Sequence, residues 1–325
     1  AMDILLKRCS KIYLNGQTTD ITEKHIENIN KAATEMAKGA LRVLALGIRE
    51  DDDSAREEDL TFVGLVGMID PPRPEARDSV KTLKKAGIRT IMITGDHKDT
   101  ALAIAKELGI ADNEAQCIPG SELNELTQEQ LNEKVCDLRV FARVSPEHKV
   151  MIVKAFKSNG SIVSMTGDGV NDAPSLKAAD IGVAMGITGT DVAKGASDMV
   201  LTDDNFATIE KAVAEGRGIY ANIKKTVLFL LSSNFGEVIS MFTAIAAGLA
   251  APLQSIHILW INLITDSLPA LALGVDPKDK DIMSDKPRDP QESLFAHGAL
   301  PFTVYNGFMI GALTLGAFLW PPVIH

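Results

Sequence analysis

The sequence has 325 residues, of which 33 are Lys or Arg and 43 are Asp or Glu, so its formal net charge is −10. Hydrophobic residues make up 46% and charged residues 23% of the chain, which is close to the globular average and excludes disordered and collagen-like classes. The acidic balance argues against a nucleic-acid-binding protein, which usually carries a basic surface. The three cysteines, Cys9, Cys117 and Cys136, are too few and too far apart for a disulfide framework or a zinc site.

The first two thirds of the chain alternate between short apolar runs and helical patterns. Residues 1–59 contain a helix-rich stretch from Thr22 to Leu46 and are interpreted as part of a separate domain. From Leu60 the alternation is typical of βαβ units around a mostly parallel sheet. The expected strands are 60–66, 88–93, 139–142, 161–165, 181–184 and 199–201, and the expected helices are 75–86, 98–108 and 147–158.

Three long apolar runs follow Lys225, at residues 227–251, 256–275 and 301–320. Each reaches the roughly 20 residues that a membrane helix needs, and buried helices of a soluble core are the alternative. The turn at 251–255 carries no Lys or Arg, whereas basic residues flank the first two runs on their other sides. The positive-inside rule therefore predicts a membrane hairpin with the globular part and the 276–300 loop in the cytoplasm.

Two predicted strands end in the same three residues, Thr94-Gly95-Asp96 and Thr166-Gly167-Asp168. Ligands of open parallel sheets bind beyond the carboxyl ends of the strands. A hydroxyl, a glycine amide that allows close approach and a carboxylate suit phosphate and metal ions. Two copies in one sheet therefore indicate a phosphate site.

The second copy continues to Asp172, so Asp168 and Asp172 are candidates to share one Mg²⁺. A calcium-binding EF-hand loop starting at Asp168 is excluded because alanine occupies its required Gly and Glu positions. No phosphate-binding P-loop motif occurs either. Lys149 follows Pro146, which favours a helix start, and its charge would stabilise a transferring phosphoryl group at the strand ends.

Five polar residues in the first two apolar runs are spaced to share helix faces. They are Asn234 and Glu237 in the first run, and Asn262, Thr265 and Asp266 in the second. A carboxylate at membrane depth costs roughly 2.5–3.5 kcal/mol on insertion scales. Together the two sets would offer oxygen ligands to a hard cation such as Ca²⁺, and hydrogen bonding between helices is the alternative. Pro269 lacks an N–H group and would free the carbonyl of Thr265.

These motifs occur together in P-type ATPases, which are ion pumps with a haloacid-dehalogenase-like phosphoryl-transfer domain. The chain resembles this family over essentially its whole length, and most closely its calcium-transporting branch of sarco/endoplasmic reticulum type, including prokaryotic relatives. The residues that carry the resemblance are Asp70-Pro71-Pro72-Arg73, the Thr94 and Asp168 strand ends, Lys149, and Gly167 to Lys177.

The resemblance implies a phosphoryl-transfer site and a nucleotide site. The implied catalytic residues are Thr94, Gly95, Asp96, Lys149, Asp168, Asn171 and Asp172, with Asp168 and Asp172 on Mg²⁺. The implied ATP contacts are Arg42, Thr94, Gly95, Asp96, Arg143, Lys149 and Asn171. Asp70 matches an interdomain hinge, and the five polar residues of the apolar runs match calcium ligands on the fifth and sixth membrane helices.

The implied organisation has three parts. Residues 1–67 would complete a nucleotide-binding domain, 68–220 would form an α/β phosphorylation domain with a Rossmann-like parallel sheet, and 221–325 would form a helical membrane hairpin and a third membrane helix. The implied protein is a multi-pass membrane protein, in the cell membrane if prokaryotic, with its soluble part in the cytoplasm. Its implied partners are the lipid bilayer, ATP and the transported cation.

One departure from the family is large, because the D-K-T-G-T motif that holds the phosphorylated aspartate is absent from the 325 residues. We therefore expect the chain to be an internal fragment that neither hydrolyses ATP nor transports ions without the missing parts of the same pump. Ca²⁺ export through an aspartyl-phosphate is the expected function of the intact protein. The alternatives are a pump for Mn²⁺ or Na⁺, a membrane-anchored phosphatase-like domain, and a non-catalytic binding protein.

Overall fold

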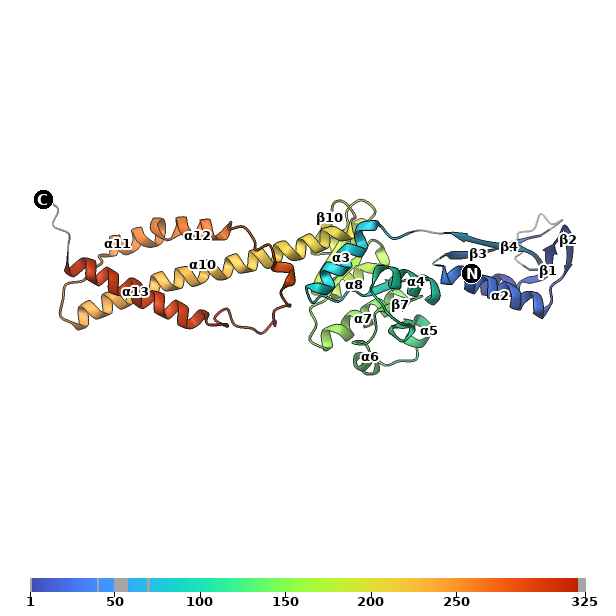
Figure 1. The fold of residues 1–325 in the computed structure, drawn as a ribbon, viewed down its shortest axis with the longest axis horizontal. Coiled ribbons are helices and arrows are strands. Elements are labelled where there is room, and N and C mark those ends of the chain that lie inside the picture. The colour runs from blue at the N-terminus through green and yellow to red at the C-terminus, as the bar shows by residue number, and fades with distance from the viewer. Residues whose placement is uncertain (1, 40, 50–57, 69–70, 321–325) are drawn as a thin grey trace. The chain divides into compact units, whose positions relative to one another are not determined.

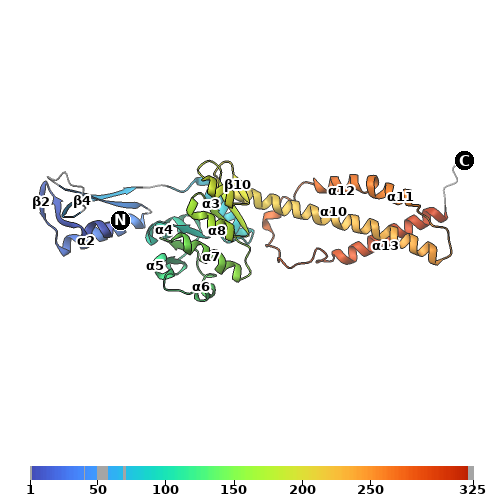
Figure 2. The ribbon, with the colours of Figure 1, turned by 180° about the vertical axis from the view of Figure 1, so that it is seen from behind.

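The structure is a computed structural model that describes residues 2–39, 41–49, 58–68 and 71–320. It divides into two compact units, Ala1–Lys84 with Ile88–Thr208, and Lys85–Gly87 with Ile209–His325. Figure 1 labels the elements in chain order, and Figure 2 shows them from behind.

The N-terminal part is a four-stranded sheet packed against two helices. Its elements are α1 (Met2–Lys7), β1 (Cys9–Leu14), β2 (Gln17–Asp20), α2 (Glu23–Lys38), β3 (Arg42–Ile48) and β4 (Leu60–Met68). The strand order is β2-β1-β4-β3, with β1 parallel to β4 and the other pairs antiparallel. Leu6, Ile12, Ile29 and Phe62 form the core between helices and strands.

The expected helical stretch from Thr22 to Leu46 is wrong in its C-terminal part, where residues 42–48 form β3. The helix ends at Gly39, whose N–H donates to the carbonyls of Glu35 at 3.3 Å and Met36 at 3.0 Å. Residues 42–48 then pair antiparallel with β4. The Arg, Leu and Ala residues of this segment favour a helix, but sheet pairing overrides that propensity. The strand expected at 60–66 is confirmed as β4, but it belongs to this sheet.

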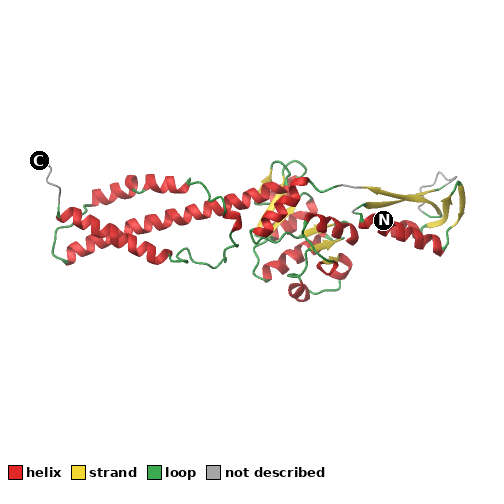
Figure 3. Ribbon diagram, viewed as in Figure 1, coloured by secondary structure: helices red, strands yellow, loops and turns green. Residues whose placement is uncertain are grey.

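Residues 71–208 form an α/β arrangement of short parallel strands and surrounding helices (Figure 3). The strands are β5 (Met92–Thr94), β6 (Cys117–Pro119), β7 (Val140–Ala142), β8 (Ser164–Gly167), β9 (Ile181–Met185) and β10 (Met199–Leu201). The helices are α3 (Pro74–Lys85), α4 (Lys98–Leu108), α5 (Gly120–Leu123), α6 (Gln128–Lys134), α7 (Pro146–Ser158), α8 (Ala173–Ala178) and α9 (Asp191–Ala196), with 3-10 turns at Glu114–Gln116 and Val170–Asp172.

These strands form two parallel sheets, β5-β7-β6 and β10-β9-β8, so the expectation that both Thr-Gly-Asp ends belong to one sheet is wrong. The strand expected from Ser161 begins only at Ser164, because the N–H of Val163 donates to the Asp180 carboxylate at 2.9 Å and is not available to a neighbouring strand. The sheets still share a core, since Ile93 and Val163 pack against the buried clusters of both.

The second unit is built from long apolar helices. They are α10 (Phe206–Ala246), α11 (Ser255–Trp260), a π-helical turn (Ile261–Thr265), α12 (Ser267–Gly274) and α13 (Ala299–Leu319). In the described part of the chain, three helical segments are long and apolar enough to cross a membrane: Phe206–Ala246, Ser255–Gly274 and Ala299–Leu319. They lie side by side in Figures 1 and 2, which confirms the three expected runs, although the first ends at Ala246 and not at residue 251.

The loop between α12 and α13, which includes a 3-10 turn at Ile282–Ser284, is bound along the first half of α10. The Arg217 guanidinium donates to the carbonyls of Ile282 and Asp285, both at 2.9 Å. The Arg288 guanidinium stacks 4.2 Å above the Tyr220 ring. These contacts hold the loop against an uninterrupted helix that continues into the membrane-capable segment.

Candidate functional site

The first Thr-Gly-Asp sequence forms a tight turn at the carboxyl end of β5. The Thr94 hydroxyl donates to the Asp96 carboxylate at 3.0 Å and accepts from the Asp96 N–H at 3.1 Å. The end of β7 lies beside this turn, because the Arg143 N–H donates to the Asp96 carbonyl at 3.1 Å. Arg143 has a φ of 50°, so the backbone after β7 bends sharply at the edge where Thr94 and Asp96 lie.

Lys149 is placed by the first turn of α7. Ser145 caps the helix by accepting from the His148 N–H at 3.4 Å, and the Nδ1 atom of His148 accepts the Ser145 N–H at 3.1 Å. The Nε2 atom of His148 therefore carries the hydrogen and donates to Asn124 at 2.9 Å. This reciprocal cap, with Pro146 at the first helical position, starts the helix at a defined residue.

Lys149 and Asp172 form a close ion pair, with Nζ 2.5 Å from Oδ1. The other oxygen of Asp172 accepts the N–H groups of Asp168 at 3.2 Å and Gly169 at 3.1 Å. Burial alone would raise the pKa of Asp172, but these hydrogen bonds and the Lys149 charge outweigh it and hold the pKa below its usual range. Asp172 is only 6% exposed, so it is a buried carboxylate with both oxygens occupied.

Asp168 and Asn171 contrast with Asp172. Both are exposed, and neither side chain makes a hydrogen bond or ion pair within the part of the chain that the structure describes. Asp168 follows β8 directly, and its carbonyl accepts the N–H of Thr190 at 2.9 Å. The backbone of Asp168 is thus fixed on both sides while its carboxylate is available to a ligand.

The two Thr-Gly-Asp glycines have different surroundings. A Cβ atom on Gly167 would lie 2.5 Å from Cβ of Asp172, whereas a Cβ on Gly95 would meet nothing within 4 Å. Glycine is therefore sterically required only in the second sequence, where it lets Asp172 pack against the strand end.

Two candidates cannot be placed. Asp70 lies outside the described residues, and for Arg42 only the backbone, at the start of β3, is described. The candidate nucleotide contacts that the structure does bring together are Thr94, Asp96 and Arg143, and the candidate phosphate contacts are Lys149, Asp168 and Asp172.

The membrane candidates meet in part. The Asn262 amide on the π-helical turn donates to Oε2 of Glu237 on α10 at 3.3 Å. Oε1 of Glu237 and Oδ2 of Asp266 are buried without a hydrogen-bond partner, and Asp266 is only 4% exposed. Asn234 and Thr265 are exposed, and no side-chain bond joins them to this group among the described residues. The π-helical turn that carries Asn262 lies just before α12. α12 contains Pro269, the residue for which the sequence predicts unwinding.

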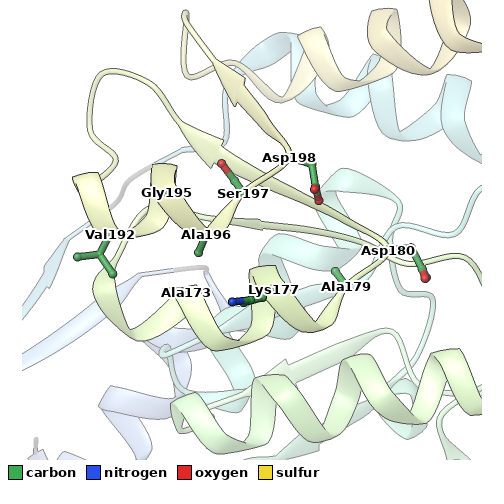
Figure 4. Close-up of a pocket in the computed structure, with 9 residues that line it drawn as sticks. All are labelled: Ala173, Lys177, Ala179, Asp180, Val192, Gly195, Ala196, Ser197 and Asp198. Carbon is green, nitrogen blue, oxygen red and sulfur yellow. The ribbon is translucent and has the colours of Figure 1, made fainter.

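A pocket of about 430 Å³ lies elsewhere, between α8 and α9 (Figure 4). Several lining residues, including Asp180 and Asp198, precede β9 and β10 at their amino ends. None of the candidate residues lines it. Within the described residues, no three His, Cys, Asp or Glu side chains gather in a way that could hold a metal ion.

Sequence reasoning missed two groups at the phosphate edge. One is the pair of His148 and Asn124, which fixes the start of α7. The other is the backbone N–H of Thr190, which holds Asp168. A capping pattern of Ser145 and His148 around Pro146 was a usable signal for the first, whereas a backbone amide leaves no trace in a sequence.

Comparisons with known proteins show what the chain is similar to. A family model described as haloacid dehalogenase-like hydrolase matches residues 3–180, and one described as cation transporting ATPase, C-terminus, matches residues 250–325. The chain is 61% identical over 324 residues to calcium-transporting ATPase 1 of Bacillus cereus, which covers 98% of the chain and 36% of that relative.

Two further relatives are similar over the same stretch. A calcium-transporting ATPase of Bacillus subtilis is 50% identical over 325 residues, covering 98% of the chain, and one of Listeria monocytogenes is 45% identical over 315 residues, covering 95%. In each case the chain spans 36% of the relative's length. The hydrolase model covers more than half of the chain, and the cation-transporter match contains two of the membrane-capable segments, Ser255–Gly274 and Ala299–Leu319. The chain belongs to the haloacid dehalogenase-like hydrolase family.

Proposed function

We propose that the chain is part of an ATP-driven pump that exports Ca²⁺ from the cytoplasm through an aspartyl-phosphate intermediate. The observation that carries this proposal is a pair of buried, unpartnered carboxylate oxygens, on Glu237 and Asp266, in membrane-capable helices. A buried carboxylate oxygen without a partner is costly, and a bound cation removes that cost. The names of the relatives as calcium-transporting ATPases support Ca²⁺ as the cation.

The transported cation would bind between α10 and the broken helix formed by α11, the π-helical turn and α12. Ca²⁺ takes six to eight oxygen ligands in flexible geometry, which two carboxylates alone do not supply. We therefore assign further ligands to the side chains of Asn262, Asn234 and Thr265 and to the Thr265 carbonyl, which has no proline N–H to accept at position 269. The remaining ligands would come from parts of the pump outside this chain.

Mg²⁺ is the second ion that the proposal requires, and the residues at the end of β8 fit it. Asp168 presents an exposed carboxylate on a fixed backbone, and Asn171 presents an amide oxygen in the same turn. Mg²⁺ binds through one or two such carboxylates, waters and substrate phosphates, and when bound it would neutralise charge on the transferring phosphoryl group.

Lys149 would act on the phosphoryl group from the same edge. In the structure its ammonium is held by Asp172, which keeps the charge pointed at the strand ends. A phosphoryl oxygen that takes over Lys149 would leave Oδ1 of Asp172 free to join Asp168 at the metal ion. Asp172 would thus serve first to order the turn and then as the second metal ligand.

The nucleotide would lie beside the first Thr-Gly-Asp turn. We assign Thr94, Gly95, Asp96 and Arg143 to nucleotide and phosphate contacts, because they lie on adjoining strand ends with the backbone of Arg143 bonded to that of Asp96. Arg42 would reach ATP from the N-terminal sheet. The phosphorylated aspartate is not among these residues, since no D-K-T-G-T occurs in the 325 residues, so the chain alone is expected to be inactive.

The chain is that of a multi-pass membrane protein. We place its α/β part in the cytoplasm because Lys and Arg flank the membrane hairpin on that side and are absent from the turn at 251–255. This orientation would put the nucleotide site and the entry to the cation site on the same side of the membrane.

The test is a chimera in which the chain replaces the corresponding segment of the Bacillus cereus ATPase, to which it is 61% identical. Asp266→Asn should raise the Ca²⁺ concentration for half-maximal ATP hydrolysis by at least the roughly 10- to 100-fold that loss of a supporting partner costs a metal site. Asp279→Asn, in the exposed loop before α13, is the matched control and should behave as the unsubstituted chimera.

Unchanged Ca²⁺ activation in Asp266→Asn and Glu237→Gln would contradict the proposal and favour a membrane-anchored phosphatase-like domain. ATP hydrolysis that is activated by Mn²⁺ or Na⁺ in place of Ca²⁺, with the same sensitivity to Asp266→Asn, would support an ion pump whose transported cation is not Ca²⁺.

A further inference from the structure

A carboxylate outside the proposed site holds an exposed loop that leads to it. Oδ1 of Asp204 accepts the N–H groups of Gly186 at 2.6 Å and Ile187 at 3.0 Å. Oδ2 accepts the N–H of Thr188 at 2.7 Å and its hydroxyl at 2.8 Å. All four bonds go to consecutive residues that follow β9, so one side chain fixes the path of this loop.

Apolar packing does little to order this loop. Ile187 is 72% exposed, and Thr188 is exposed as well. Gly189 approaches the carbonyl of Met185 so closely that any Cβ atom would overlap it, so glycine is required at this position. Hydrogen bonds to a charged acceptor are about twice as strong as neutral ones, so the Asp204 carboxylate is the principal restraint on residues 186–188.

The backbone of Asp204 is arranged for this contact. Asp204 has a φ of 49°, a left-handed conformation that costs non-glycine residues energy and that Asp tolerates better than most. The neighbouring Asp203 contacts a different element. Its carboxylate accepts the N–H of Asn205 at 3.2 Å and the Thr208 hydroxyl at 2.6 Å at the start of α10. Adjacent carboxylates therefore face different elements, one the loop and the other the helix.

The loop ends on the residue proposed to bind Mg²⁺. Thr190 accepts the Ala193 N–H at 3.3 Å as the cap of α9, and its own N–H donates to the carbonyl of Asp168 at 2.9 Å. A continuous series of bonds thus runs from the Asp204 carboxylate through residues 186–190 to the Asp168 peptide. Hydrogen bonds from backbone groups hold the pKa of Asp204 at about 2, with Ile187 as the largest contributor, so the carboxylate is ionised at neutral pH.

The geometry points to Asp204 as a positioning residue that fixes the Asp168 peptide, and thereby its metal-binding carboxylate, through the 186–190 loop. This inference rests on the proposed function in one respect, namely that Asp168 binds the divalent cation. Because Asp204 lies in the turn that also starts α10, the same turn orders the phosphate edge and the first residues of the helix that carries Glu237.

The experiment measures Mn²⁺ binding to the purified full chain in detergent by electron paramagnetic resonance of the free ion. The Mn²⁺ that is lost in Asp168→Asn defines the Asp168 site. Asp204→Asn should weaken binding at that site by about 10-fold, the lower end of what loss of a supporting partner costs a metal site. Asp203→Asn makes the same charge change one residue away and should leave Mn²⁺ affinity as it is in the unsubstituted chain.

A milder pair of variants covers the case in which Asp204→Asn does not fold. Thr188→Val removes one of the four bonds and should weaken Mn²⁺ binding and speed hydrogen exchange of the Thr190 amide, whereas Thr188→Ser keeps the hydroxyl and should restore both.

The outcomes separate the two claims. Full Mn²⁺ affinity in Asp204→Asn and Thr188→Val, with loss in Asp168→Asn, would overturn the positioning role and leave the proposed function intact. Equal losses in Asp203→Asn and Asp204→Asn would also overturn it, because the effect would then be one of charge alone. No loss in Asp168→Asn would contradict the proposed Mg²⁺ site and the inference with it.

Discussion

The two Thr-Gly-Asp turns allow the same substitution to be tested in two environments. In Gly167→Ala the new Cβ would lie 2.5 Å from Cβ of Asp172 and 2.8 Å from its Cγ, far inside van der Waals contact. Asp172 cannot move aside freely, since it is bound to Lys149 and to the N–H groups of Asp168 and Gly169. Overpacking of this kind costs about 1–3 kcal/mol.

Gly95→Ala is the matched control, because its Cβ would meet nothing within 4 Å. With no clash, alanine should be neutral or stabilise the fold by up to about 0.4–1 kcal/mol, since it restricts the unfolded chain. The same residue change in the same motif should therefore destabilise the fold at Gly167 and not at Gly95.

The assay is hydrogen exchange in the purified chain, of the β8 and β9 amides for Gly167→Ala and of the β5 and β7 amides for Gly95→Ala. It reports local opening and does not require two-state unfolding of the whole protein. Gly167→Ala should speed exchange by roughly 5- to 150-fold, the equivalent of 1–3 kcal/mol, and Gly95→Ala should not. Equal effects of the two substitutions, or faster exchange in Gly95→Ala alone, would refute the packing argument.

Three further predictions concern other contacts. Lys149→Met should raise the pKa of Asp172, since burial then acts without the opposing hydrogen bond and charge, and an unchanged carboxyl titration by carbon NMR would count against the ion pair. Tyr220→Ala should make the 276–298 loop about 2- to 5-fold more sensitive to protease, from the 0.5–1 kcal/mol of an exposed cation–π contact. Tyr220→Phe keeps the ring beneath Arg288 but removes the hydroxyl that accepts from the Arg288 guanidinium at 2.9 Å, so its protease sensitivity should lie between those of Tyr220→Ala and the unsubstituted chain. Equal sensitivity of all three would show that the stacking does not hold the loop. The pKa of Asp204 is lowered from 3.8 to about 2, so its stabilising bonds are complete above about pH 4 and lost as the pH falls through 2. Asp204→Asn should therefore weaken the dependence of the melting temperature on pH between about pH 4 and 2. An unchanged dependence in this range would contradict the assignment.

The sequence predicted local structure best where a single short-range pattern determines that structure. Apolar runs of membrane length, the strand ends at Thr94 and Asp168, and Pro146 before Lys149 all predict local structure from short-range physics. The helix boundary at Gly39 was missed because propensity is a weak guide where residues 42–48 gain more by pairing with β4.

Other features depend on contacts that no local pattern encodes. The division into two parallel sheets depends on which strands pair, and the start of β8 depends on the side chain of Asp180 taking the Val163 N–H. The difference between Gly95 and Gly167 is likewise invisible in identical triplets, because it depends on where Asp172 packs. Asp204 was missed for the same reason, since an Asp before a helix start is ordinarily interpreted as a cap.

The central claim is that the phosphate edge and the membrane carboxylates serve one reaction. The most direct test is ATP-driven uptake of radiolabelled Ca²⁺ into membrane vesicles that carry the chimera with the Bacillus cereus ATPase. The account predicts that Asp168→Asn abolishes uptake and that Asp266→Asn raises the Ca²⁺ concentration for half-maximal uptake by at least roughly 10-fold. One of these residues follows β8 and the other directly precedes α12, and Asp279→Asn should change neither property. Uptake that survives Asp168→Asn, or an unchanged Ca²⁺ dependence in Asp266→Asn, would contradict the account.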